Sequence, residues 1–371
     1  MAPLVRLGLN FWQAAWVAAE DPARLDRELD LLADAGVREL RILAGAEGPD
    51  DAPARVVPSL QPSPGRWNER LLAGLEHALV AADARGMRAI LCLGNFWSWS
   101  GGLAQYRAWA GSGAIPQPLD GPAYCRFAAG FYRDAAARAL FDAHVEHVVR
   151  RLRAAPAVAV WEILNEPRGM HDPEGNRAFL AETAARIAAL DPGRDIATGS
   201  EGSTADPGAA GLDFAADHAS EHVTVATCHL WPENWGLWDP RADDDAQFEE
   251  VLAWSRAYLR RHAERAAELG KPLLVEELGL ARDGRRLDAG AGTRRRDRFF
   301  AAMLEEAEAL ANDGLPVRGI ALWTWSGESL VPGAAPRPRG GDPPHEPDGW
   351  YGIGARDAST LAALQGRPGA G

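Results

Sequence analysis

The sequence predicts an α/β fold in which eight parallel strands and their helices form one (β/α)8, or TIM, barrel, as a single domain over residues 1–371. Three observations predict it. Short apolar strands alternate with amphipathic helices along the chain, a glycine joins several helices to the next strand, and no internal linker divides the sequence. Eight such units favour a closed barrel over an open doubly wound sheet, and no GxGxxG motif follows the first strand.

The helix–glycine–strand unit is clearest at the start of the chain. Asp21 and Pro22 begin a helix with apolar residues at helical spacing, and Gly36 ends it, because glycine adopts the left-handed conformation at little cost. The other helices that end in this way are expected at residues 68–85, 248–269 and 298–313. The eight strands are expected at residues 5–9, 39–43, 87–93, 158–164, 195–198, 223–228, 273–277 and 317–323. The fifth unit has the weakest pattern.

Two long segments follow predicted strands, residues 94–134 and 326–358, and both are rich in Gly, Pro and Trp. In barrels of this type the chemistry lies at the carboxyl ends of the strands, in the loops that follow them. Loops of this length in a compact domain are usually functional. We therefore expect both segments at the active-site face.

Composition limits the class of partner. The net charge is −13 and no basic stripe is present, so we expect neither nucleic acid nor a membrane as a partner, and no apolar run is long enough to span a bilayer. The basic run 294–296 is interpreted as a solvated helix start or as structural ion pairs. Cys92, Cys125 and Cys228 lie far apart without CxxC spacing, so they are expected to be buried thiols rather than metal ligands.

The first residues, MAPLVRLGLNFW, lack the charged and apolar regions of a signal peptide. We therefore expect a cytoplasmic protein for the chain as written, or a secreted one if it is a trimmed mature form. A monomer is expected.

Acidic residues end two predicted strands: Glu166 follows the fourth, and Glu276 and Glu277 end the seventh. Retaining glycosidases need two carboxyl groups roughly 5 to 5.5 Å apart, and strands four and seven face each other across a barrel. A single acid at a strand end is explained as well by a cap or a salt bridge, but two together favour catalysis. Strand alternation lets only one of Glu276 and Glu277 enter the pocket without deciding which. Glu162 lies deeper and is expected to be a structural acid of the barrel interior.

Five strings extend this interpretation: WEILNEPRG, ATCHLWPENWG, KPLLVEELG, ALWTWSGE and GDPPHEPDGWYG. They resemble the endo-1,4-β-mannanases of glycoside hydrolase family 5, from the first strand through the last helix. The Asn-Glu-Pro and Glu-Glu-Leu-Gly motifs occur in the same order, with His-x-Trp-Pro between them. This resemblance implies that Glu166 is the acid/base and Glu277 the nucleophile.

The resemblance also implies a set of substrate-binding residues: Arg41, Asn165, His229, Trp231, Trp323, Trp97, Trp235 and Arg168. Arg41 would steady the nucleophile, since a fixed cation lowers the pKa of a carboxyl group. Asn165 would bind the sugar 2-hydroxyl, Arg168 the leaving-group side, and Trp323 the face of the reacting sugar. His229 would lie near the acid/base and the substrate.

Trp231 departs from many relatives, which place a tyrosine there whose hydroxyl contacts the nucleophile. An indole N–H can donate but cannot accept, so the fine tuning of the nucleophile remains open. Of the 14 tryptophans, several fall at or beyond strand ends, where indole faces could stack on sugar rings: Trp97, Trp99, Trp231, Trp235, Trp323, Trp325 and Trp350.

The leading prediction is a retaining hydrolase of β-1,4-mannosidic bonds in mannans or mannooligosaccharides, acting by double displacement without a cofactor or metal. One alternative is an exo-β-mannosidase on short oligosaccharides, which the missing export signal favours because polymeric mannan does not enter cells. A different class is a catalytically silent barrel that only binds glycans. Such a binder has no need to keep both acids together with Arg41, Asn165 and His229.

Overall fold

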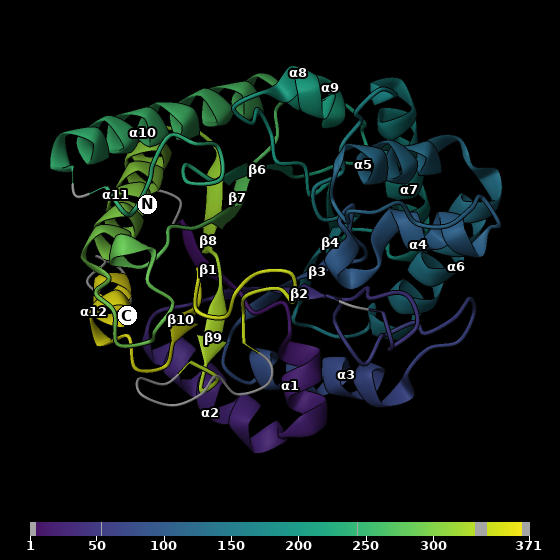
Figure 1. Cartoon of the computed structure of the whole chain (residues 1–371), viewed down its shortest axis with the longest axis horizontal. Coiled ribbons are helices and arrows are strands. Elements are labelled where there is room, and N and C mark those ends of the chain that lie inside the picture. The colour runs from purple at the N-terminus through teal and green to yellow at the C-terminus, as the bar shows by residue number, and fades with distance from the viewer. Residues whose placement is uncertain (1–4, 53, 243, 331–339, 366–371) are drawn as a thin grey trace.

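The computed structural model describes residues 5–52, 54–242, 244–330 and 340–365. Eight parallel strands form one sheet in the order β5-β4-β3-β2-β1-β8-β7-β6 (Figure 1). The strands are β1 (Arg6–Asn10), β2 (Glu39–Leu43), β3 (Arg88–Cys92), β4 (Val158–Glu162), β5 (Asp195–Ala197), β6 (Ala226–Leu230), β7 (Leu273–Leu278) and β8 (Val317–Leu322). The predicted single-domain (β/α)8 barrel is therefore confirmed.

The barrel closes between β5 and β6, the two ends of the sheet. Ala197 and Val225 form an isolated parallel bridge, and the Val225 N–H donates to the Ile196 carbonyl at 3.1 Å. β5 has three residues, which explains why the fifth unit is weakly patterned in the sequence.

Long helices surround the strands (Figure 1). The six longest of the outer ring are α2 (Pro22–Asp34), α3 (Glu69–Asp83), α6 (Ala135–Leu152), α7 (Pro173–Leu190), α10 (Asp245–Glu268) and α11 (Arg294–Asn312). Asp21 caps α2 by accepting from the Arg24 N–H at 3.0 Å, with Pro22 in the first turn. α10 begins before the predicted position because Asp244 caps it through the N–H groups of Ala246 and Gln247.

Shorter helices complete the described chain: α1 (Ala14–Glu20), η1 (Ser98–Ser100), α4 (Gly102–Trp109), α5 (Pro122–Ala129), η2 (Gly130–Arg133), α8 (Pro207–Ala210), α9 (Phe214–Asp217), η3 (Asp283–Arg285) and α12 (Ala358–Gln365). None of the helices in the described ranges is long and apolar enough to cross a membrane.

The core has two parts. A small cluster of Ile90, Val160, Ala197, Val225 and Leu274 fills the space within the strands, and a much larger one packs the strands against the helices. All three cysteines are buried free thiols, as predicted.

The basic run at residues 294–296 is partly a solvated helix start and partly a structural ion pair. Arg296 is fully buried and donates to Asp357 at 2.9 Å, so one arginine forms a structural ion pair. Arg294 lies exposed at the start of α11.

The segment 94–134 folds as a helical insert containing η1, α4, α5 and η2. It needs Gly101, where φ is +97° and a Cβ would lie 1.9 Å from the Glu47 carbonyl oxygen. The segment 326–358 overlaps a small two-stranded sheet of β9 (Trp325–Gly327) and β10 (Ile353–Gly354), and its residues 331–339 lie outside the described part of the chain.

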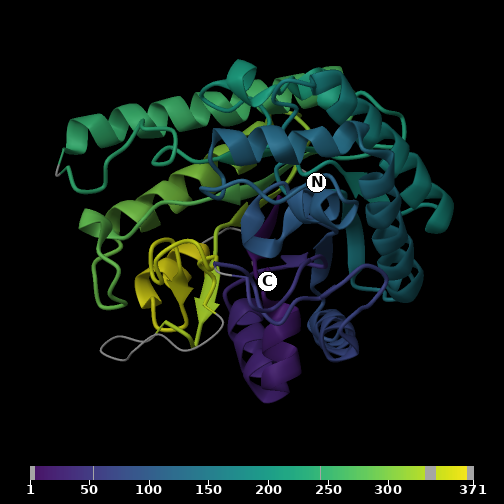
Figure 2. The ribbon, with the colours of Figure 1, turned by 45° about the vertical axis from the view of Figure 1, so that its right-hand side comes forward.

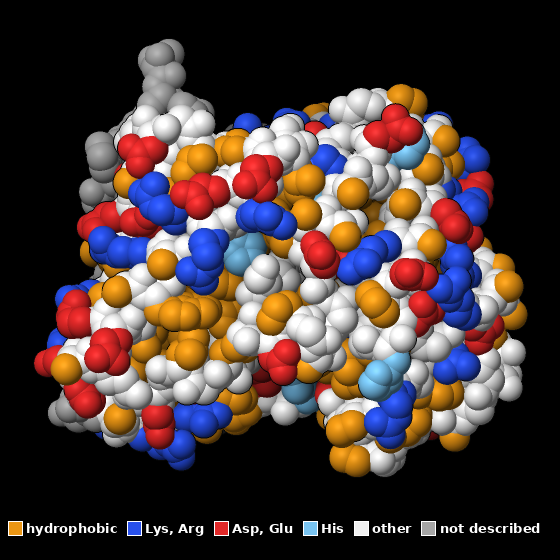
Figure 3. Space-filling model, turned by 90° about the horizontal axis from the view of Figure 1, so that it is seen from above, with side chains coloured by type: hydrophobic (Ala, Val, Ile, Leu, Met, Phe, Trp, Pro, Cys, Tyr) orange, Lys and Arg blue, Asp and Glu red, His pale blue; other side chains and the backbone are white. Residues whose placement is uncertain are grey.

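The C-terminal segment, formed by β9 and residues 340–365, lies beside the N-terminal helices, and Gln365 donates to the Asp34 carbonyl at the end of α2. Figure 2 shows the C-terminal segment, in yellow, next to the purple N-terminal helices, and Trp325 Nε1 donates to Glu28 on α2 at 2.8 Å. On the face in Figure 3, acidic and basic side chains are interspersed and no continuous basic stripe crosses it.

Candidate active site

A cavity of about 370 Å³ opens beyond the carboxyl ends of the strands. Eight of the predicted site residues line it: Trp97, Asn165, Glu166, Arg168, Trp231, Trp235, Glu277 and Trp323. The other two, Arg41 and His229, are buried and contact its acids. The helical insert contributes Trp99 and Asp120 to the wall, and the C-terminal segment contributes Pro343, His345 and Glu346.

Glu166 lies in the turn after β4, and its backbone is in the left-handed region, with φ at +53°. For a residue other than glycine this conformation costs about 1 to 3 kcal/mol. Its N–H donates to the Gly199 carbonyl at 3.0 Å, and that of Asn165 donates to Gly94 at 2.8 Å. Neighbouring loops thus hold the turn that presents the acid to the cavity.

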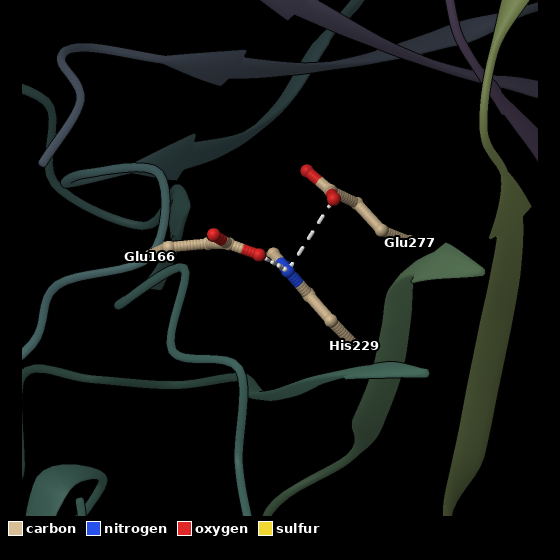
Figure 4. A group of neighbouring side chains, drawn as sticks. All are labelled: Glu166, His229 and Glu277. Atoms are coloured by element: carbon tan, nitrogen blue, oxygen red, sulfur yellow. Dashed lines mark hydrogen bonds and ion pairs between the residues drawn. The ribbon is translucent and has the colours of Figure 1, made fainter. Parts of the chain in front are cut away.

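Glu277 reaches the cavity from β7 and, like Glu166, lies close to the imidazole of His229 (Figure 4). A carboxyl oxygen of Glu166, a carboxyl oxygen of Glu277 and a ring nitrogen of His229 all lie within 4.8 Å of one another. Carboxyl groups about 5 to 5.5 Å apart are typical of retaining glycosidases, whereas inverting enzymes leave roughly 6.5 to 9.5 Å for a water molecule. Oxygens of the two acids that approach this closely favour the retaining geometry.

His229, on β6, connects the two acids. Its Nδ1 lies 2.8 Å from Glu166 Oε1 and 3.5 Å from Glu277 Oε2, and its side chain is fully buried (Figure 4). Burial alone would lower the pKa of His229, but Glu277, Glu166 and Glu276 outweigh it and hold this pKa well above its ordinary value. The surrounding carboxyl groups therefore favour the doubly protonated form of His229.

The pKa values of the two acids shift in opposite directions. Burial would raise the pKa of Glu166, but the hydrogen bond with His229, aided by Arg168 and Trp97, lowers it to about 2. For Glu277, burial prevails over His229 and Arg41, and its pKa is raised. At rest the proton nearest to Glu166 is thus held on His229 Nδ1.

Arg41 connects Glu162, inside the barrel, with Glu277. Its guanidinium donates to both oxygens of Glu162 at 2.6 Å, to Asn165 Oδ1 at 2.7 Å, and to Glu277 Oε1. Arg41 and Glu162 are buried, so these bonds are shielded from water and fix the geometry. Glu162 is the structural acid of the barrel interior that its depth in the strand predicts.

Trp97 and Arg168 flank Glu166. The Trp97 indole N–H donates to Glu166 Oε2 at 2.5 Å, and the Arg168 guanidinium lies 4.7 Å above the Trp97 ring. Arg168 also forms a bidentate pair with Glu201 at 2.6 and 2.7 Å. Trp97 and Arg168 therefore form the part of the cavity wall next to Glu166.

Trp231 packs against Tyr351 and Trp323, with ring centroids 5.0 and 6.0 Å apart. Gly279 makes room for it, since a Cβ there would lie 2.5 Å from the indole. Trp235 lines the cavity and packs on Tyr258 at 5.4 Å. The indole of Trp231 therefore forms part of an aromatic wall.

Four polar residues of the cavity wall were not predicted: Asp120, Glu201, Asn234 and Glu346. Glu201 follows the weakly patterned fifth strand, where an acid beyond the strand end is the same signal that identifies Glu166. Glu346 lies in GDPPHEPDGW, and burial raises its pKa to about 8. Asn234 belongs to the HLWPENWG string but carries no signal of its own.

The cluster of Glu166, His229 and Glu277 has a spacing that a metal ion could also use. His229 Nδ1 is already engaged with Glu166, so a metal would have to displace a shared proton. That the enzyme works without a metal or cofactor remains a prediction.

Comparison with known proteins identifies the family. The model described as GH family 5 beta-mannosidase-like matches residues 2–366. Mannan endo-1,4-beta-mannosidase 3 of Oryza sativa subsp. japonica is 32% identical over 84% of this chain and 67% of its own, and mannan endo-1,4-beta-mannosidase 1 of Solanum lycopersicum is 30% identical over 87% and 79%.

Solved structures agree. A glycoside hydrolase family 5 mannosidase from Rhizomucor miehei superposes with a TM-score of 0.86 at 31% identity, covering 96% of this chain and 91% of its own. The endo-1,4-beta-D-mannanase of Thermotoga petrophila, at 22% identity, shares the fold with a TM-score of 0.73 over 98% of both chains. The chain belongs to glycoside hydrolase family 5, in its β-mannosidase-like group.

Proposed function

We propose that this glycoside hydrolase cleaves β-1,4-mannosidic bonds in mannans or mannooligosaccharides by double displacement, with Glu277 as the nucleophile and Glu166 as the acid/base. The observation that carries the proposal is the close pair of carboxyl groups that His229 connects in a cavity of aromatic and polar residues. A barrel that only bound glycans would have no use for buried acids held so close together.

In the first step, a Glu277 oxygen attacks the anomeric carbon while the bond from that carbon to the leaving oxygen breaks. Glu166 supplies the proton that the leaving oxygen needs. In the second step Glu166 takes a proton from water, which attacks the anomeric carbon and releases Glu277. Arg41 orients Glu277 in both steps and favours its ionised form.

The acid role requires a proton on Glu166, whose pKa is low at rest. His229 Nδ1, at 2.8 Å, is the immediate source. Moving this proton to Glu166 leaves a neutral imidazole and a neutral carboxyl group, a change that a dry site favours once a sugar covers it. Glu166 and His229 therefore act as one acid.

Glu166→Ala tests the acid/base. We expect turnover of mannobiose to fall about 10²- to 10⁴-fold, because an unactivated leaving group needs the proton. With a 4-nitrophenyl β-mannoside and azide, β-mannosyl azide should accumulate, since the covalent intermediate still forms. Glu39→Ala, at the far end of the barrel, is the control. Full mannobiose turnover by Glu166→Ala would contradict the assignment.

Exo action is a second candidate because two segments remote in sequence meet at one side of the cavity. Trp99 of the helical insert and His345 of the C-terminal segment stack there, with ring centroids 6.4 Å apart. Such a wall limits how many sugars extend in that direction.

Mannohexaose separates the two modes of action. If the wall ends the cleft after one sugar, mannose and mannopentaose appear first. Early mannobiose, mannotriose and mannotetraose would instead establish endo action and rule out the exo candidate.

A further inference from the structure

Glu276, beside the proposed nucleophile, is buried without a hydrogen-bond partner. Its side chain is fully buried, and both of its oxygens lack a partner among the described residues, as does His229 Nε2. These unpartnered atoms face each other, since Glu276 Oε2 lies 3.7 Å from His229 Nε2. Burial without a hydrogen bond is costly for a carboxylate, and the imidazole next to Glu276 is the group that can offset this cost.

The other cations of the site are already engaged. Arg41 binds Glu162 and Glu277, and Arg168 binds Glu201. In the described part of the chain, His229 is the one cationic group within ion-pair distance of Glu276. Other charged or titratable groups also interact with the Glu276–His229 pair: Arg41, Glu162, Glu166, Glu201, Cys228 and Glu277.

We propose that Glu276 is a positioning residue of the reaction: from behind the imidazole it orients His229 and keeps on its Nδ1 the proton that Glu166 uses. This inference rests on the proposed function. His229 has Glu166 on its Nδ1 side and Glu276 on its Nε2 side. A carboxylate next to Nε2 favours the doubly protonated ring, in which Nδ1–H points at Glu166.

The pKa of Glu276 determines the pH range in which its negative charge acts on His229. Burial, and then the charge of Glu162, raise the pKa of Glu276 to about 7. Glu276 therefore becomes an anion as the pH rises through the neutral range, which is where an isolated imidazole loses its proton. The carboxylate extends the active form of the Glu166–His229 pair toward alkaline pH and has little effect at acid pH.

The test is the pH profile of kcat/KM on mannobiose for Glu276→Gln. Without the anion, the alkaline limb should move to lower pH by about one unit while the acid limb stays in place, because an opposite charge at this distance shifts a pKa by about that much. kcat above neutral pH should fall and KM should change little. Glu276→Asp, which keeps the charge, should restore part of the alkaline limb.

Glu39→Gln is the matched control, because it removes another fully buried carboxyl group from the barrel interior, on β2 beside Arg6 and Arg318. Both limbs should stay in place in this variant. As a measurement that does not need activity, the ring ¹⁵N signals of His229, assigned by their loss in His229→Asn, should titrate at lower pH in Glu276→Gln.

An unmoved alkaline limb together with an unmoved His229 titration would overturn the positioning role. If Glu276→Gln does not fold, Glu276→Asp and the histidine titration of the unaltered protein decide instead, and a neutral His229 ring at pH about 7 would overturn it. Failure of the proposed function looks different, because Glu166→Ala would then retain mannobiose turnover.

Discussion

Replacing Glu277 with alanine is expected to lower kcat on β-mannosides by about 10⁴-fold or more, because Glu277 forms the covalent intermediate in the proposed mechanism and alanine has no nucleophilic atom to replace it. Glu276 does not line the cavity, and Glu166, which contacts the same nitrogen of His229 as Glu277 does, serves as the acid/base. The measurement is the initial rate on mannobiose and on a 4-nitrophenyl β-mannoside.

Azide distinguishes loss of the nucleophile from loss of the acid. In Glu277→Ala, azide can enter the space of the missing carboxylate and attack the sugar directly, which gives α-mannosyl azide. Glu166→Ala should give the β-anomer. A β-anomer from both variants, or near-normal turnover by Glu277→Ala, would show that Glu277 is not the nucleophile.

Arg41→Met is expected to have the second largest effect, on both stability and activity. It leaves Glu162 and Glu277 buried without their cation, and breaking a buried pair in this way costs about 3 to 5 kcal/mol. The pKa of Glu277 would rise further, so the nucleophile would be ionised only at higher pH. The acid limb of the kcat/KM profile should therefore move up by about one unit or more.

Denaturant unfolding and the pH profile measure these effects separately. Arg41→Lys is the matched control, since it keeps the charge but loses the bidentate geometry toward Glu162. Its acid limb should shift less than that of Arg41→Met, while much of the stability loss remains. An acid limb in its normal place in Arg41→Met would refute the role of Arg41 in ionising Glu277.

The architecture could be predicted from the sequence because its signals are local. Apolar spacing and the glycines that end helices locate each unit along the chain, and eight units in a row leave few alternatives to a closed barrel. The exact first residue of a helix depends on more than this spacing. α10 begins at Asp245 rather than near Phe248 because a capping side chain, and not periodicity, sets its first residue.

Part of the site was also predictable. Acids and tryptophans at strand ends, together with the family resemblance, identified ten residues that the barrel brings into or directly beneath one cavity. Asp120, Asn234 and Glu346 were missed because loops remote in sequence bring them together, and no local pattern records which loops meet. Glu201 carries the same strand-end signal as Glu166, but it follows the short and weakly patterned fifth strand.

The choice between Glu276 and Glu277 is the clearest case of a feature that the sequence alone could not determine. The sequence determined that carboxylates end the fourth and seventh strands, and strand alternation allowed one of Glu276 and Glu277 to enter the cavity. Leu274 belongs to the cluster inside the barrel, so alternation places Glu276, two residues later, on that same inner face. Yet Glu277 lines the cavity. The tertiary structure decides this because the pairing of β6 and β7 shifts between Cys228 and His229, which sets His229 opposite Glu277 near the strand end, where the barrel opens.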